Sequence, residues 1–168
     1  MDAIFAIDKP VGPTSHDVVA RIRRAARLRR VGHAGTLDPL ASGVLVVALG
    51  NATRLVEYLT ADDKAYRAVI DFGSETATDD AEGDVTRTGP VDHLDATAIT
   101  AALDAFRGTI TQVPPSYSAI SVGGERLHAL ARRGVAVEAP PRQVTIDAID
   151  LIAWEAPRAT IEIGRAHV

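Results

Sequence analysis

The chain contains no cysteine, one methionine and one tryptophan among its 168 residues. The absence of cysteine excludes disulfides, thiolate catalysis and cysteine-based zinc sites, and it fits a reducing cytoplasm, where we expect the protein to act. No apolar run reaches the roughly 18 residues that a membrane span needs, so we expect no membrane partner. The first residues, MDAIFAIDKP, include acids and lack an early basic group, which is not typical of a signal peptide.

An excess of positive charge is also absent, since the formal net charge is −4. The charge is uneven, however, because six arginines and no acid lie in RIRRAARLRR, Arg21–Arg30. A locally basic face can bind phosphates on an acidic chain, since the nearby field matters more than the total charge. Arg21, Arg24 and Arg27 have helical spacing, and we expect this row to face solvent.

The apolar pattern predicts strands mixed with short helices. Strands are expected at Ile4–Asp8, Val44–Leu49, 64–73 and 142–155, and helices at 15–29, 52–59, 95–107 and 124–134. The first helix has a Thr14–Asp17 capping box and a buried stripe of Val18, Ile22 and Ala25, and the third has a stripe of Ile99, Ala102, Leu103 and Phe106. The acidic stretch up to Gly89 is expected to form a turn or a hairpin end. Without regular strand–helix alternation, this mixture indicates an α+β fold with a mainly antiparallel, mixed sheet and flanking helices.

A single carboxylate, Asp38, stands in the glycine-rich turn VGHAGTLDPLASG, Val31–Gly43. The glycines allow a ligand to approach the backbone closely, and a carboxylate can act as a nucleophile or a base. The residue types equally fit a turn aspartate that bonds its own backbone before Pro39. Composition and spacing leave both interpretations open.

Structural interpretations also exist for the other candidates. His33 can simply orient the turn, Tyr66 can be a core residue on the apolar face of its strand, and the arginine row can be a solvated helix face. The acids of TDDAEGD lack the spacing of an EF-hand calcium loop. Neither a Walker loop nor a dinucleotide fingerprint is present.

Several motifs, in the same order, resemble the tRNA pseudouridine synthase B family. GHAGTLDPLASGVL resembles its catalytic motif, IDKPVGPTSHDVV its lysine–proline motif, KAYRA its tyrosine strand, and TATDDAEGDV and QVPPSYSAISVGGERLHALARRG its middle segments. The resemblance covers roughly residues 4 to 152. It implies the pseudouridine synthase catalytic fold and a monomeric enzyme that flips and isomerises the T-loop uridine at position 55 of tRNA, with the T-arm as partner.

The resemblance also implies roles for individual residues. Asp38 aligns with the essential aspartate, which attacks the nucleoside at the base or at the sugar C1′. Since uracil is retained and reattached, neither a cofactor nor a metal is needed. Among the RNA-binding residues, His33 aligns with a histidine near the flipped uridine, Tyr66 with a tyrosine that stacks on the base, and Lys9 with a support of that tyrosine's surroundings. Arg24 and Arg27 are expected to contact phosphates.

Departures from the family are concentrated near the end of the chain. Ser121 and His128 replace the lysine and tyrosine that are common there. The family continues after Ile161 with an arginine segment that pairs with the aspartate, and usually with a small RNA-binding domain. We therefore expect residues 1–161 to be a partial catalytic domain, incomplete at the C-terminus and inactive by itself if the arginine is essential.

The last residues, EIGRAHV (162–168), are also encoded by one frame of a common sequencing adapter. We expect them to be a non-native, poorly packed tail after a strand without partners, and genomic DNA spanning the locus tests this. Two other functions remain open: a guide-RNA-dependent rRNA pseudouridine synthase, and an RNA-binding or folding module without catalysis. The first usually has a longer N-terminal extension.

Overall fold

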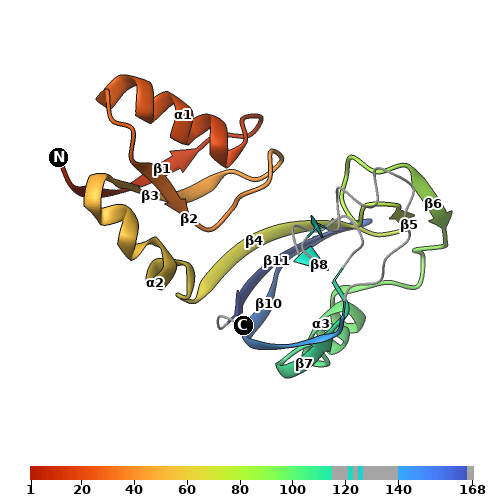
Figure 1. The fold of residues 1–168 in the computed structure, drawn as a ribbon. Coiled ribbons are helices and arrows are strands. Elements are labelled where there is room, and N and C mark those ends of the chain that lie inside the picture. Colours follow the sequence, from red (N-terminus) through yellow and green to blue (C-terminus); the bar gives the residue numbers. More distant parts are fainter. Residues whose placement is uncertain (115–120, 123–124, 127–139, 166–168) are drawn as a thin grey trace. The chain divides into compact units, whose positions relative to one another are not determined.

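The computed structural model describes residues 1–114, 121–122, 125–126 and 140–165. It divides into two compact units, Met1–Asp62 and Asp63–Val168. Helices and strands are mixed along the chain (Figure 1), and every strand pair in the described residues is antiparallel. The α+β prediction with mainly antiparallel sheets is confirmed.

The first unit is a three-stranded sheet with a helix packed on one face (Figure 1). Its elements are β1 (Ala3–Lys9), α1 (Ser15–Ala26), β2 (Val31–Ala34), β3 (Gly43–Leu49), the 3-10 helix η1 (Gly50–Leu55) and α2 (Val56–Thr60). β3 lies between β1 and β2. The core contains Val18, Val19, Val31, Leu45, Val47 and Leu49. β3 can occupy the centre because its residues 45 and 47 to 49 are nearly or fully buried.

Strand register determines which side chains of the outer strands face α1. Ile7 pairs with Leu45, and His33 pairs with Val47. Direct cross-strand partners project from the same face of a sheet, so His33 shares the core face. Lys9 lies two residues after Ile7 and therefore projects from this face as well.

The boundaries of α1 are fixed by its caps. The Thr14 hydroxyl accepts the amide of Asp17, and the Asp17 carboxylate accepts the Thr14 amide, as the capping box predicts. The Thr14 hydroxyl also donates to the Asp17 carboxylate at 2.6 Å, and this bond, together with the one from the Thr14 amide, lowers the pKa of Asp17. The helix ends at Ala26, three residues before the predicted end, because Arg27 adopts a left-handed conformation with φ 54°. Val18 is buried as predicted, whereas Ala25 is exposed.

Truncation of Leu45 tests whether the β3 core stabilises the first unit. Leu45 is 1% exposed, so Leu45→Ala is expected to lower the free energy of unfolding by about 2–5 kcal/mol, through lost burial and a cavity. Urea unfolding followed by circular dichroism measures the change. The control is Val44→Ala on the opposite face, where the side chain is 70% exposed, with an expected effect of about 0.5 kcal/mol or less. Equal losses for the two variants would contradict the assigned core.

The second unit contains a four-stranded sheet with the order β4-β11-β10-β7 and two short hairpins. Its elements are β4 (Lys64–Asp71), β5 (Ser74–Thr76), β6 (Val85–Thr88), α3 (Ala96–Asp104), β7 (Gly108–Gln112), β8 (Ser121–Val122), β9 (Glu125–Arg126), β10 (Arg142–Glu155) and β11 (Arg158–Arg165). Ile99 and Leu103 of α3 are buried against the sheet. Asp95 caps this helix by accepting the amide of Ala98 at 2.8 Å.

The expectation that residues 162–168 pack poorly is wrong for Glu162–Arg165. These residues belong to β11, which is hydrogen-bonded to β10 on one side and to β4 on the other. Ile161 is buried, and Ile163 packs against the same core because the two residues alternate onto one face. Residues 166–168 lie outside the described residues.

Other boundaries also differ from the predictions. Of the predicted stripe, Ala102 and Phe106 are exposed, and Phe106 lies beyond the helix, since α3 ends at Asp104. The predicted helix at 124–134 is wrong at its start, because Glu125–Arg126 forms β9 and pairs with β8. The rest of that helix, including His128, lies outside the described residues. The predicted hairpin end before Gly89 is confirmed by the pairing of β5 with β6.

Candidate functional site

Asp38 lies in the loop between β2 and β3, with its side chain exposed. Its backbone carbonyl accepts the amide of Ala41 at 3.0 Å, which closes a tight turn. Within the described part of the chain, its carboxylate has neither a hydrogen bond nor an ion pair. The turn is therefore held by backbone groups, and the carboxylate is left available to a ligand.

The segment that precedes α1 is hydrogen-bonded to this loop on both sides of Asp38. The Gly12 amide donates to the Pro39 carbonyl at 2.8 Å. The Ser15 hydroxyl donates to the Leu37 carbonyl at 3.0 Å and accepts the Leu37 amide at 2.9 Å. Ser15 is 2% exposed, so these contacts are shielded from water. The role of Ser15 was not predicted, because a serine at the first position of a helix is common and carries no specific signal.

Lys9 is fully buried, with 0% exposure. Its ammonium donates to the carbonyl oxygens of Pro10 and Pro13 at 2.9 and 2.8 Å. A buried ammonium must be hydrogen-bonded to offset its desolvation, and these carbonyls supply that requirement. In the described structure the ammonium of Lys9 supports the loop after β1, and the expected contribution of Lys9 to the RNA-binding site stays a prediction.

His33 is partly buried at the end region of β2. Its Nδ1 lies 2.6 Å from the carbonyl oxygen of Gly35. A carbonyl can only accept, so Nδ1 carries the proton and Nε2 is the acceptor in the neutral ring. The ring of His16 packs edge-on against His33, with centroids 6.0 Å apart and planes at 84°. The Gly35 carbonyl and the His16 ring thus orient the imidazole, and neither contact was predicted from the sequence.

Four of the six arginines between positions 21 and 30 differ in whether their guanidinium groups have structural partners. Arg23 donates to the carbonyl of Val31 at 3.1 Å, and Arg30 donates to the side chain of Asn51 at 3.2 Å, so both have structural partners. Arg24 and Arg27 are exposed, and their guanidinium groups have no hydrogen bond or ion pair in the described residues. These two are available to phosphates, as predicted for the solvent-facing row.

Tyr66 belongs to the second unit, near the start of β4, and is 39% exposed. Ala68, Ile70 and Phe72 follow it on the same face and pack against the core of that unit. Tyr66 is not part of the packed cluster, although its strand directs it to the same side. Because the Tyr66 ring is partly exposed, it is better suited to stack on a ligand than to fill the core.

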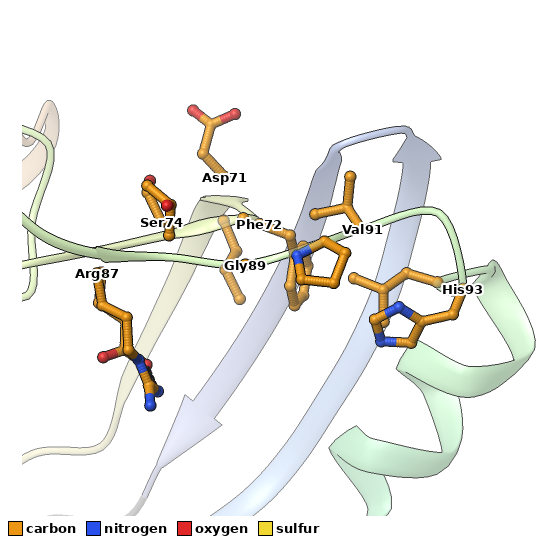
Figure 2. A pocket seen from close by; sticks show the side chains of 13 residues that line it. Asp71, Phe72, Ser74, Arg87, Gly89, Val91 and His93 are labelled. Atoms are coloured by element: carbon orange, nitrogen blue, oxygen red, sulfur yellow. Dashed lines mark hydrogen bonds and ion pairs between the residues drawn. The ribbon is translucent and has the colours of Figure 1, made fainter.

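In the described part of the second unit, two of the open hollows have walls that contain none of the predicted site residues. The hollow in Figure 2, of about 550 Å³, has Phe72 and Val91 in its wall and His93 at one end. Its charged groups already have partners, because Arg87 pairs with Glu75 and Asp71 accepts Arg158 at 2.7 Å. Among the described residues that line this hollow, the acids Asp71 and Glu75 are paired with arginines, and His93 is the imidazole at its end.

Among the residues that the structure describes, no group of three or more His, Asp or Glu is arranged to hold a metal ion. No helix in that part of the chain is both long and apolar enough to cross a membrane.

Comparisons with known proteins give one consistent family. Residues 23–167 match the model of the TruB family pseudouridylate synthase, N-terminal domain. Several curated relatives are named tRNA pseudouridine synthase B. The relative from Thermobifida fusca is 54% identical over 86% of this chain and 50% of its own length. The relative from Gloeobacter violaceus is 51% identical over 98% of this chain and 57% of its own length. The relative from Mycobacterium tuberculosis is 53% identical over 95% of this chain and 54% of its own length. The chain therefore spans about half the length of the curated relatives it matches.

Solved structures show the same fold. The chain is similar to one in the crystal structure of a Cbf5-Nop10-Gar1 complex, with a TM-score of 0.70 and 30% identity over 98% of this chain and 39% of that one. A second match comes from an H/ACA RNP bound to a substrate RNA containing 2′-deoxyuridine, with a TM-score of 0.67 and 26% identity. It covers 98% of this chain and 38% of the matched chain.

Proposed function

Because the chain belongs to the TruB family of pseudouridylate synthases, we propose that it carries the catalytic aspartate of an enzyme that converts the T-arm uridine 55 of tRNA to pseudouridine. The observation that carries this proposal is the state of Asp38. Its carboxylate is exposed and unpaired in the described residues, while the backbone on both sides of it is hydrogen-bonded. Such a group is free to attack a nucleoside and is held in place to do so.

The proposed reaction is an isomerisation in which every atom of uracil is retained. The C1′–N1 glycosidic bond breaks, the base turns, and a C1′–C5 bond forms; C5 loses its proton and N1 gains one. Asp38 supplies the nucleophilic oxygen, either to the base or to C1′. Neither an external leaving group nor a change of redox state is involved, so the reaction needs no cofactor or metal.

The other predicted residues are proposed to hold the RNA. A uridine inside a folded T-loop must be flipped out before an enzyme can reach it, and an aromatic ring stabilises the flipped base by stacking. The exposed ring of Tyr66 is suited to that role. The Nε2 atom of His33 has no hydrogen bond to the residues that the structure describes, and the bond from Nδ1 to Gly35 orients it to accept one from RNA. Arg24 and Arg27 can neutralise phosphates.

The arginine row provides a test of the RNA interface. Arg24→Ala combined with Arg27→Ala is expected to weaken tRNA binding, and to make the slope of log affinity against log salt shallower by roughly 0.7–0.9 for each lost phosphate contact. Filter binding over a salt series measures the slope. The choice of uridine should not change, because phosphate contacts position the RNA without reading the base.

The matched control removes the same charge elsewhere, from Arg87 and Arg158. Both form exposed ion pairs with carboxylates of the second unit. We expect this pair of substitutions to change the salt slope by less than the substitution of Arg24 and Arg27. An unchanged tRNA affinity and salt slope for the Arg24/Arg27 variant would show that these arginines form a solvated helix face and do not contact phosphates.

A guide-RNA-dependent rRNA enzyme is the second candidate, and the structural matches to a Cbf5-Nop10-Gar1 complex and to an H/ACA RNP bound to a substrate RNA favour it. The identities favour the tRNA enzyme, being 51–54% to the tRNA synthases but 30% to the Cbf5 chain. Tritium release from a C5-labelled tRNA transcript separates the two. We expect release without a guide RNA and in the presence of a chelator, from the protein encoded by the complete reading frame around this chain. Release only with a guide RNA would favour the second candidate.

The monomeric state and the cytoplasmic location are part of the same proposal. A single T-arm presents one target uridine, and tRNA is available in the cytoplasm. Sedimentation equilibrium with and without tRNA tests the first point, and cell fractionation tests the second.

A further inference from the structure

We infer that Gly12 and Ser15 are the positioning residues of Asp38, with the buried Ser15 hydroxyl as the central contact. The inference rests on the proposed function, since it assigns a role in catalysis to residues that do not touch the RNA. Gly12 and Ser15 fix the residues that immediately follow and precede Asp38, and they leave the aspartate side chain itself unconstrained.

The Ser15 hydroxyl uses both of its hydrogen-bonding functions on one residue. It accepts the Leu37 amide at 2.9 Å and donates to the Leu37 carbonyl at 3.0 Å. Both peptide groups that flank Leu37 are therefore fixed, and the second of them is the peptide bond to Asp38. Because Ser15 is 2% exposed, water does not readily replace these bonds when they open.

Gly12 holds the other side of the aspartate. Its amide donates to the Pro39 carbonyl at 2.8 Å while its own φ is +110°, a conformation that favours glycine. The loop that contains Gly12 is in turn fixed by the Lys9 ammonium, which binds the carbonyls of Pro10 and Pro13. The buried Lys9 ammonium thus fixes the loop around Gly12, and this loop fixes the turn that contains Asp38.

Placement of this accuracy matters for a nucleophile. A misplacement of about 1 Å can reduce the rate of a reaction by a factor of about 100, because the attacking atom must meet its target at contact distance. The carboxylate of Asp38 has no side-chain partner in the described residues to orient it. The anchors at positions 37 and 39 add to the bond from the Ala41 amide and together fix the backbone from which this carboxylate projects.

The first arm of the test is hydrogen exchange, which does not depend on activity. In Ser15→Ala the Leu37 amide loses its acceptor, so its protection in this chain should fall by about tenfold or more. The control is Thr14→Ala, which removes the cap of the same helix without touching Leu37. It should leave the protection of Leu37 within about threefold of the wild type, given that a lost cap typically acts on its own helix end. Unchanged protection in Ser15→Ala would overturn the inference.

The second arm is kinetic and uses the protein from the complete reading frame. Ser15→Ala should reduce kcat for pseudouridine formation by about 10- to 100-fold with KM for tRNA nearly unchanged, because the phosphate and stacking contacts remain. Ser15→Thr keeps the hydroxyl and should recover most of kcat, whereas Thr14→Ala should not show this separation of kcat from KM. Circular dichroism verifies that each variant is folded.

The outcomes separate this inference from the proposed function. Lost Leu37 protection with an unchanged kcat, or equal kcat losses for Ser15→Ala and Thr14→Ala, would overturn the positioning role. If the wild-type protein makes no pseudouridine, the proposed function fails and the positioning role of Gly12 and Ser15 in catalysis fails with it. The exchange arm would then still decide whether the anchor itself exists.

Discussion

Asp38→Asn is expected to abolish pseudouridine formation while tRNA affinity stays nearly the same. Asparagine preserves the size and shape of the side chain but removes the charge and nucleophilicity of the oxygen. The local fold should persist, because the turn is held by the Ala41 amide, the Ser15 hydroxyl and the Gly12 amide, and not by the Asp38 carboxylate. Tritium release measures turnover, and filter binding measures affinity.

The matched control for this change is Glu57→Gln. Glu57 is an exposed acid of α2 in the same unit, so the substitution removes the same charge. We expect its turnover to stay within about twofold of the wild type, since exposed substitutions away from special contacts have small effects. Substantial turnover by Asp38→Asn would return Asp38 to the role of an ordinary turn residue.

Tyr66→Ala is expected to lose both turnover and part of the RNA affinity, whereas Tyr66→Phe should cost far less. Stacking of a base on an aromatic ring contributes about 1–3 kcal/mol, which corresponds to a loss of roughly 5- to 150-fold for the alanine variant. Phenylalanine keeps the ring face and removes only the hydroxyl. Single-turnover kinetics with a T-arm RNA measures the rate, and a titration measures the affinity.

Tyr58→Ala is the control for the loss of an exposed aromatic ring. Tyr58 lies in α2 and is 67% exposed, compared with 39% for Tyr66. It should have little effect on either quantity. A Tyr66→Ala variant that turns over like Tyr58→Ala would show that the Tyr66 ring does not stack on the substrate.

Local patterns predicted most of the elements because the physical signals were local. The Thr14–Asp17 capping box marked the start of α1, and alternation marked β4 and β10, which extends over Arg142–Glu155 as expected. The end of α1 was predicted too late, since no glycine marks it and an arginine adopts the left-handed conformation at position 27. The packing of β11 was missed because its two neighbours, β4 and β10, depend on pairing between distant segments.

The candidate site was predictable to a similar degree. The motif around Asp38 identified the carboxylate, and helical spacing identified Arg24 and Arg27 as exposed. The sequence did not predict the structural partners of Arg23 and Arg30, because the carbonyl of Val31 and the side chain of Asn51 come within reach only in the folded chain. The contacts of Ser15 and of the Lys9 ammonium were not predicted for the same reason: their partners are backbone groups, which carry no sequence signature.

The place of β11 in its sheet also has a consequence during synthesis on the ribosome. β1, β2 and β3 are complete once residue 49 has emerged, so the first sheet can pair early. β4 must wait for β11, since Asp71 and its partner Arg158 are 87 residues apart. At about 5–20 residues per second, that interval is roughly 4–17 s. During it, an unpaired strand with Val69 on one face and Ile70 on the other is open to chaperones and to neighbouring nascent chains.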